Sequence, residues 1–229
     1  MNNNQSQNFS KIDLKDNLII INKKRKFNPL GKISNKGIID ASEFAKKMTY
    51  EKEGEHRKSR SGGIHVRDND EIFSNTFRGK LAEIAFYEFF KNKNGIVISE
   101  PDFETYKRGK WDNTDFILNN FKINVKSSTH FSNLLLLEKK DWNSNAEYIP
   151  NIPFKEQNYD FFFFIRIHSD DKTYPFDIPG YVTNADLKLI IQNNHSILKG
   201  YTLGSKKLDA DNYYFQSGEM RQLRINKLV

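Results

Sequence analysis

The apolar run at residues 161–165, four phenylalanines followed by an isoleucine, constrains the fold more than any other stretch of the sequence. An uninterrupted run of large β-favouring side chains is typical of a strand that is covered on both faces. Such a strand needs a sheet with further layers packed on each side. We therefore predict that a strand over residues 159–167 lies at the centre of a layered α/β structure.

Helical and strand periodicities alternate along the rest of the chain. The helices that we expect cover residues 70–91, from apolar residues at helical spacing, then Asp40 or Ser42 to about 50, and Thr183 or Asn184 to about 192. Further short strands are expected at 96–98, 115–118, 122–126, 134–137, 181–182, 213–215 and 222–225, with a strand or helical turn at 14–21. This order predicts an α/β fold in which helices flank a central mixed β-sheet.

The N-terminal part of the chain has a different composition. Residues 1–11 are rich in Asn, Gln and Ser, which is typical of disordered segments, and residues 22–37 carry six basic residues and no acid. Residues 54–70 are also basic and glycine-containing, and both basic segments are expected to be loops. We therefore predict an N-terminal extension at residues 1–69 and a core at residues 70–229.

Composition narrows the classes of function. The formal net charge of +7 favours a polyanionic partner, with nucleic acid ahead of a membrane, although an ordinary basic surface gives the same value. The chain has no cysteine, which excludes disulfides, thiolate metal sites and cysteine nucleophiles. No apolar run approaches the ~18 residues of a membrane-spanning helix, and the polar N-terminus lacks the features of a secretion signal. We expect a cytoplasmic protein with no membrane partner.

Three polar residues on two adjacent predicted strands carry the chemistry. Asp115 precedes one strand, and Asn124 and Lys126 lie on the next, beyond a turn at Asn119 and Asn120 whose residue type tolerates positive φ. Side chains two residues apart share a face of a strand, so Asn124 and Lys126 project together while Val125 points into the core. The hairpin brings Asp115 next to them. Oxygen ligands for a hard cation such as Mg²⁺ and a lysine are what phosphodiester hydrolysis requires.

A further acid, Glu83, lies upstream on the predicted helix at residues 70–91. Together these residues resemble the PD-(D/E)xK nuclease superfamily, which includes many type II restriction endonucleases and Holliday-junction resolvases. The resemblance covers roughly residues 70–170. It implies a restriction-endonuclease-like fold and a Mg²⁺ site held by Asp115 and the residue at position 124. It also implies that Lys126 is the motif lysine and Glu83 an auxiliary acid, with Glu100 and Asp102 as weaker alternatives to Glu83.

The chain departs from the family pattern at two positions. Thr114 stands where a proline often precedes the aspartate, which is common in the family. Asn124 stands where an acid is expected, and an amide oxygen is a weaker ligand for a hard cation than a carboxylate. Three readings remain open. In the first, members of the family tolerate Asn at this position and the enzyme is active. In the second, the protein binds DNA without cutting it. In the third, Asn124 replaces an aspartate in a chain made to trap uncut DNA.

The resemblance and the charge together predict a bacterial, Mg²⁺-dependent, sequence-specific double-stranded DNA endonuclease of a restriction–modification system, acting as a homodimer on a palindrome. The alternatives are a non-catalytic DNA-binding protein with a nuclease-like fold and a structure-specific resolvase or repair nuclease. The charged candidates among these residues could also be ordinary solvent-exposed side chains with no role in function. The residues expected to contact DNA are Arg57, Arg60, Arg67, Arg78, Lys107, Arg108, Lys110, Ser127, Ser128 and His130.

Overall fold

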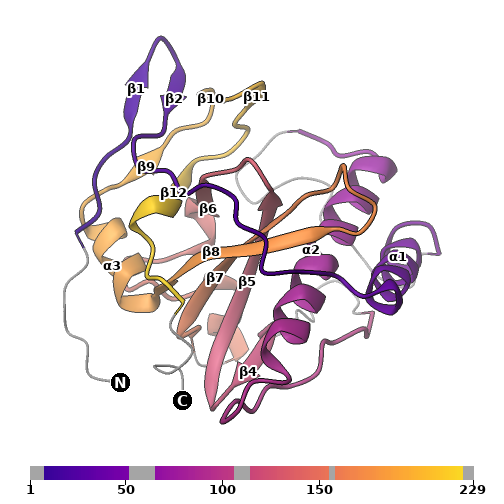
Figure 1. Cartoon of the computed structure of the whole chain (residues 1–229). Helices are drawn as coiled ribbons and strands as arrows, with labels where there is room; N and C mark the ends of the chain where they lie inside the picture. The colour runs from indigo at the N-terminus through magenta and orange to yellow at the C-terminus, as the bar shows by residue number, and fades with distance from the viewer. Residues whose placement is uncertain (1–7, 52–64, 106–113, 155–157, 224–229) are drawn as a thin grey trace.

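A five-stranded mixed sheet forms the centre of the molecule (Figure 1). The computed structural model describes residues 8–51, 65–105, 114–154 and 158–223. In order of pairing, the strands are β3 (Gly31–Lys32), β8 (Pro175–Thr183), β7 (Phe161–Ile167), β5 (Phe121–Thr129) and β4 (Phe116–Leu118). β5 and β7 run parallel, and the other pairs are antiparallel. The predicted mixed α/β architecture is confirmed.

Strand β7 is covered on both faces, as its apolar run predicts. Phe163 and Ile165 belong to the hydrophobic cluster beneath the two long helices. Phe162 and Phe164 belong to a second cluster on the opposite face of the sheet. All four side chains are essentially inaccessible to solvent. The alternation along one strand therefore supplies the centre of both cores.

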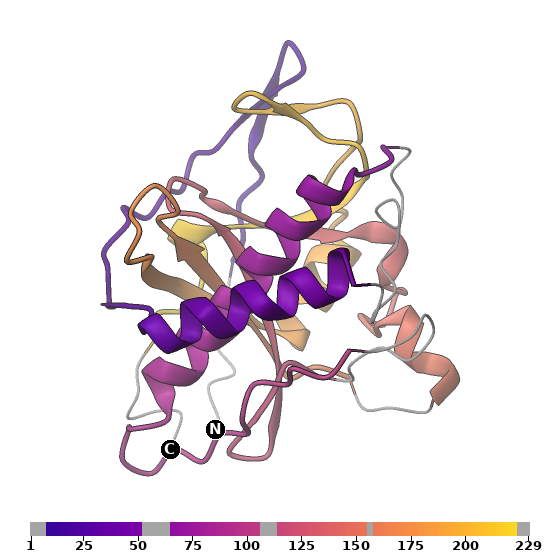
Figure 2. The ribbon, with the colours of Figure 1, turned by 90° about the vertical axis from the view of Figure 1, so that its right-hand side faces the viewer.

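Helices α1 (Asn35–Thr49) and α2 (Asn69–Phe90) cover one face of this sheet (Figures 1 and 2). The prediction for α2 is confirmed to within a residue at each end. An aromatic side chain of α2 packs the helix against the sheet: the ring centroid of Phe86 lies 5.2 Å from that of Phe116 and 4.9 Å from that of Phe163. This packing fixes the side of the sheet on which the residues of α2 lie.

The predicted start of α1 is wrong. Ser34, rather than Asp40 or Ser42, caps the helix by accepting a hydrogen bond from the Gly37 amide at 3.0 Å. Gly37 suggested a loop in the sequence, but it lies in the first helical turn. A Cβ at this position would approach Cγ2 of Ile84 to 2.6 Å, so the absence of a side chain lets α1 lie close against α2.

The opposite face of the central sheet carries a second layer. It contains α3 (Asn184–Gln192), whose N-terminus has a complete capping box from Thr183 and Asp186, as the sequence predicts for Thr183. Beside it lies an antiparallel sheet of β6 (Leu134–Glu138), β12 (Asn212–Gln216) and β9 (Ser196–Ile197). Leucines from β6 and Phe215 from β12 pack against Phe162 and Phe164. The central sheet is therefore enclosed between helices and a mixed helix–sheet layer.

A small sheet extends from this second layer. Its strands, in order of pairing, are β1 (Asp13–Lys15), β2 (Leu18–Ile20), β10 (Thr202–Leu203) and β11 (Lys206–Lys207). Short 3₁₀ segments complete the described chain: η1 (Lys139–Asp141), η2 (Ile149–Phe154) and η3 (Ser217–Glu219). Phe9 and Ile33 belong to the two hydrophobic clusters described above, and Ile12 belongs to a third one, with Ile19 of β2 and Tyr214 of β12. Residues from the predicted N-terminal extension therefore take part in the cores.

Two predicted strands are absent from the described residues. At 96–98 only Ile98 forms a bridge, to Leu118, although backbone hydrogen bonds from Ser99 to Ile117 and from Asn119 to Val97 hold the segment along the edge of β4. Gln222 and Leu223 are not in a strand, and residues 224 and 225 lie outside the described ranges. No α-helix among the described residues has both the length and the apolar character needed to cross a membrane.

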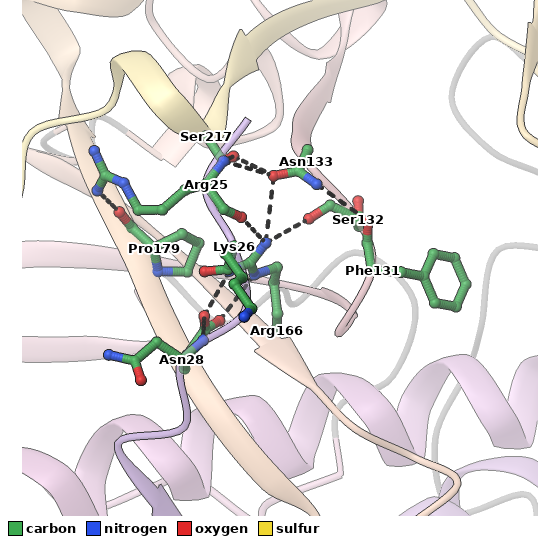
Figure 3. Close-up of polar contacts among 10 residues, drawn as sticks. Arg25, Lys26, Asn28, Phe131, Ser132, Asn133, Arg166, Pro179 and Ser217 are labelled. Carbon is green, nitrogen blue, oxygen red and sulfur yellow. Dashed lines mark hydrogen bonds and ion pairs between the residues drawn. The ribbon is translucent and has the colours of Figure 1, made fainter. Parts of the chain in front are cut away.

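A fully buried arginine ties the N-terminal segment to the sheet (Figure 3). Arg166 of β7 donates from Nε to Oδ1 of Asp177 at 2.9 Å and from Nη2 to Oδ2 at 2.5 Å. Its guanidinium also donates to the carbonyls of Arg25, Lys26 and Ser132. Because a planar guanidinium satisfies five acceptors at fixed angles, this residue sets the path of the chain before β3.

Asp177→Asn is expected to lower the free energy of unfolding by about 3–5 kcal/mol, since it leaves a buried guanidinium without its counter-charge. Urea denaturation monitored by circular dichroism measures the change. Asp40→Asn is the matched control, because the Lys36–Asp40 pair lies on the surface, where solvent screens it, and its loss should change stability far less. Equal effects of the two substitutions would contradict a structural role for the buried pair.

Candidate functional site

The hairpin formed by β4 and β5 places Asp115 against the strand that carries Asn124 and Lys126. The turn residues Asn119 and Asn120 have φ values of 46° and 69°, as the sequence predicts for a tight hairpin turn. The register pairs Phe116 with Ile123, so the next step along the hairpin sets Asp115 beside Asn124. Oδ2 of Asp115 accepts a hydrogen bond from the amide of Val125 at 2.5 Å. This hydrogen bond holds the carboxylate of Asp115 against the backbone of residues 124–126.

The parallel pairing of β5 with β7 determines which way the side chains face. Asn124 pairs with Phe162 and Lys126 with Phe164, whereas Val125 pairs with Phe163. Paired residues in a ladder share a face of the sheet, so Asn124 and Lys126 lie on the same face, opposite α2. Val125 packs into the cluster beneath α2, as predicted.

The side chain of Asn124 is buried with an unsatisfied acceptor. Only 6% of the residue is exposed, and its Oδ1 atom is buried with no hydrogen-bond partner. Leaving a buried acceptor unpaired costs on the order of 1–3 kcal/mol. This oxygen and the carboxylate of Asp115 are hard donors on adjacent positions of the hairpin, so together they suit a cation that prefers oxygen ligands.

Asp115 lies in an unusual electrostatic environment. Burial raises the pKa of its carboxyl group, while the charge of Lys126, the hydrogen bond from Val125 and the charge of Lys80 oppose the rise. The desolvation effect is the largest of these, so the pKa lies above its ordinary value. A raised pKa in a specific charge environment is common at functional sites.

Lys80 is a component of this region that sequence reasoning missed. It is a buried lysine of α2 whose Nζ atom lies 2.5 Å from Oε2 of Glu83 and 2.6 Å from the carbonyl oxygen of Asp102. Nζ also lies 4.4 Å from the ring centroid of Phe44. The signal was a lysine within the apolar face of a helix, three residues before an acid. The structure therefore places Glu83 in an ion pair with Lys80, and Lys80 within electrostatic reach of Asp115.

The remaining site predictions fall into three groups. Arg67 and Arg78 are half-buried, each with a buried Nε atom that lacks a hydrogen bond, and burial lowers the pKa of Arg78. Ser127, Ser128 and His130 are half-buried along β5 and just beyond its end. The candidates that lie outside the described residues are Arg57, Arg60, Lys107, Arg108 and Lys110. Contact of any of these residues with DNA stays a prediction.

Comparison of the chain with protein-family models, with curated proteins and with solved structures finds no match. The case for a function therefore rests on the chemistry of the residues and on their arrangement.

We expect Asp115→Asn to stabilise the metal-free protein at neutral pH. Because the folded-state pKa is raised, the folded protein binds a proton more tightly than the unfolded chain, so the carboxyl group destabilises the fold as pH rises through the interval between the two values. The variant removes this effect, and its advantage should disappear in acid, below the ordinary carboxyl pKa. Urea unfolding in a chelator across this pH range measures the difference.

Asp171→Asn is the control of opposite sign. Hydrogen bonds from Thr173 lower the pKa of Asp171, so its contribution to stability is present at neutral pH and lost as pH falls. A gain in stability for Asp171→Asn, or a loss for Asp115→Asn at neutral pH, would contradict the electrostatic description.

Proposed function

We propose that this protein is a Mg²⁺-dependent endonuclease that hydrolyses double-stranded DNA. The observation that carries the proposal is the register that sets Asp115 beside Asn124, whose Oδ1 atom is buried and unsatisfied, with Lys126 on the same face as Asn124. These are the donor and cation types that phosphodiester hydrolysis requires. The resemblance of the motif to PD-(D/E)xK nucleases and the net charge of +7 support the same reaction class.

The residues present fit a hard divalent cation, because both nearby donors are oxygens. Asp115 and Asn124 would hold the ion, which when bound supplies Lewis-acid activation of the phosphate and of a water. Lys126 contributes a positive charge that offsets the charge developing on the phosphate oxygens. Glu83, the auxiliary acid that the resemblance implies, pairs with Lys80 on α2, which packs on the other face of the sheet from Asn124 and Lys126.

We further propose that cleavage is sequence-specific, of the type II restriction kind, by a homodimer in the bacterial cytoplasm. Basic residues in the two predicted loops and before Asp115 would contact phosphates, and arginines among them would read guanine edges in the major groove. A symmetric dimer would place one active site on each strand of a palindrome.

A non-catalytic DNA-binding function is the second candidate, and one observation favours it. The expected acid is replaced by Asn124, whose neutral oxygen binds a hard cation less strongly than a carboxylate. In this case Asp115, Asn124 and Lys126 would have no catalytic role, and binding would depend on the basic residues of the chain.

Asn124→Asp is expected to raise the rate of plasmid cleavage in Mg²⁺ by about 100-fold or more. A second carboxylate strengthens metal binding, and each tenfold in rate requires only about 1.4 kcal/mol of transition-state stabilisation. Agarose gels measure cleavage by the two chains, and discrete fragments indicate sequence specificity. Substitution of Asp115 or Lys126 by Ala in the Asn124→Asp background should abolish cutting, whereas Lys206→Ala, an exposed strand lysine in another sheet, should not.

Absence of cleavage by both chains in Mg²⁺ and in Mn²⁺, with tight binding to duplex DNA retained, would overturn the enzyme proposal in favour of the DNA-binding one. A strong preference for four-way junctions over linear duplex would instead identify a structure-specific nuclease.

Duplex binding is expected to weaken steeply with salt, because lysine and arginine contacts to phosphate release counterions. Arg57→Ala and Arg60→Ala should each reduce the slope of log affinity against log salt concentration by about 1 if each contacts one phosphate. Fluorescence anisotropy with a labelled duplex in Ca²⁺ measures the slopes. Lys206→Ala is the charge-matched control. An equal change in its slope would contradict the proposal that Arg57 and Arg60 contact DNA phosphates.

A further inference from the structure

The parallel pairing of β5 and β7 brings two histidines together at one edge of the central sheet. The last pair in the register is Thr129 with Ile167, and the next residues are His130 and His168. Their imidazole rings stack with centroids 3.8 Å apart and an interplanar angle of 4°. The residues are 38 positions apart, so the pair is invisible in the spacing of histidines along the sequence.

A carboxylate completes the cluster. Asp170 lies two residues beyond His168, and one ligand atom from each of His130, His168 and Asp170 lies within 4.8 Å of the others. The neighbouring Asp171 is already engaged, because its Oδ1 accepts hydrogen bonds from the amide and hydroxyl of Thr173. Asp170 is exposed and therefore free to reorient toward the imidazoles.

We propose that His130, His168 and Asp170 form a binding site for a divalent transition-metal ion of the Zn²⁺ class. Two imidazole nitrogens and one carboxylate oxygen suit Zn²⁺, Co²⁺ or Ni²⁺, whereas Mg²⁺ prefers oxygen ligands alone. Zn–N bonds of about 2.0–2.1 Å put tetrahedral ligand atoms about 3.3 Å apart, so the cluster must contract by at most roughly 1.5 Å from its 4.8 Å limit. Rotation of the imidazoles and the exposed Asp170 can supply that movement.

An unsatisfied nitrogen within the cluster is the second observation. Nδ1 of His168 is buried and has no hydrogen-bond partner. The ring is nevertheless held in place, since Phe27 packs edge-on against both imidazoles, with centroids 5.7 Å from His130 and 6.2 Å from His168. The amide of His168 also donates to the carbonyl of Pro175 at 2.9 Å. Because the rings stack face to face, at least one imidazole must turn for both to bind one ion, and the packing of Phe27 keeps the two rings together as it does so.

The buried Arg166 lies two residues before His168. Burial is the main cause that lowers the pKa of His130, and the charges of His168 and, less, of Arg166 act in the same direction. Two hydrogen bonds to Asp177 compensate much of that charge. The remaining donors of Arg166 bind carbonyls of the N-terminal segment and of Ser132, which fixes the backbone around both strand ends (Figure 3).

This site is separate from the one assigned to the nuclease function. His130 lies six residues beyond Asn124, one residue past the end of the same strand, which corresponds to at most about 20 Å at about 3.3 Å per residue. Binding of a metal ion by the histidines therefore does not depend on the proposed cleavage reaction. A metal ion here would join the ends of β5 and β7 and stabilise the native state by mass action.

Isothermal titration of the untagged full-length protein with Zn²⁺, in excess Mg²⁺, tests the proposal. Co²⁺ absorption spectra report the ligand set. One ion per chain is expected, with a Co²⁺ d–d band and a rise in Tm. His130→Ala and His168→Ala should each weaken Zn²⁺ binding at least about tenfold. Loss of a residue that only hydrogen-bonds to a metal ligand already costs about this much, so loss of a ligand should cost no less. Asp170→Asn, at an exposed position, should do the same without affecting the metal-free fold.

Two controls separate this site from other sources of binding. His65→Ala removes a half-exposed histidine that pairs with Glu71, and Asp115→Ala disables the proposed nuclease site. Both should leave Zn²⁺ affinity and the Co²⁺ band unchanged. No saturable Zn²⁺ uptake by the wild-type chain, or unchanged affinity in Asp170→Asn and His130→Ala, would overturn the proposal. Loss of the band in Asp115→Ala alone would assign the ion to the nuclease site instead.

Discussion

The parallel ladder between β5 and β7 is the interaction on which the rest of the structure depends. Its register sends Val125 and Phe163 toward α2, and Asn124 and Phe162 toward the opposite layer. A shift by one residue would exchange the two faces and put polar side chains of β5 beneath the helix. The large phenylalanines of β7 oppose such a shift because they fill both cores.

The same ladder positions polar chemistry along one face of β5. Near the start of the strand, the hairpin sets Asp115 beside Asn124, where burial leaves an amide oxygen unsatisfied and raises the pKa of the carboxyl group. Beyond its end, His130 meets His168. Buried polar groups of this kind reduce stability and are retained where they serve a function. Both candidate sites thus follow from one register.

Features set by local sequence could be predicted, and those set by distant partners could not. The β4–β5 turn follows from Asn119 and Asn120, whose backbone preferences need no tertiary contact. The start of α1 was misplaced because Gly37 is accommodated by its contact with Ile84. Lys80 was overlooked because its burial depends on Glu83 and the carbonyl of Asp102. The stacking of His130 with His168 could not be predicted either, because it depends on the pairing of β5 with β7.

In the proposed function, the β4–β5 hairpin presents a cation site for hydrolysis of DNA. Anomalous scattering from Mn²⁺ in crystals of the protein bound to a DNA duplex would locate that cation. We expect a peak within bonding distance of the Asp115 carboxylate and the Asn124 Oδ1 atom, beside a DNA phosphate. A duplex bound with no peak at Asp115, or a peak confined to another part of the protein, would contradict it.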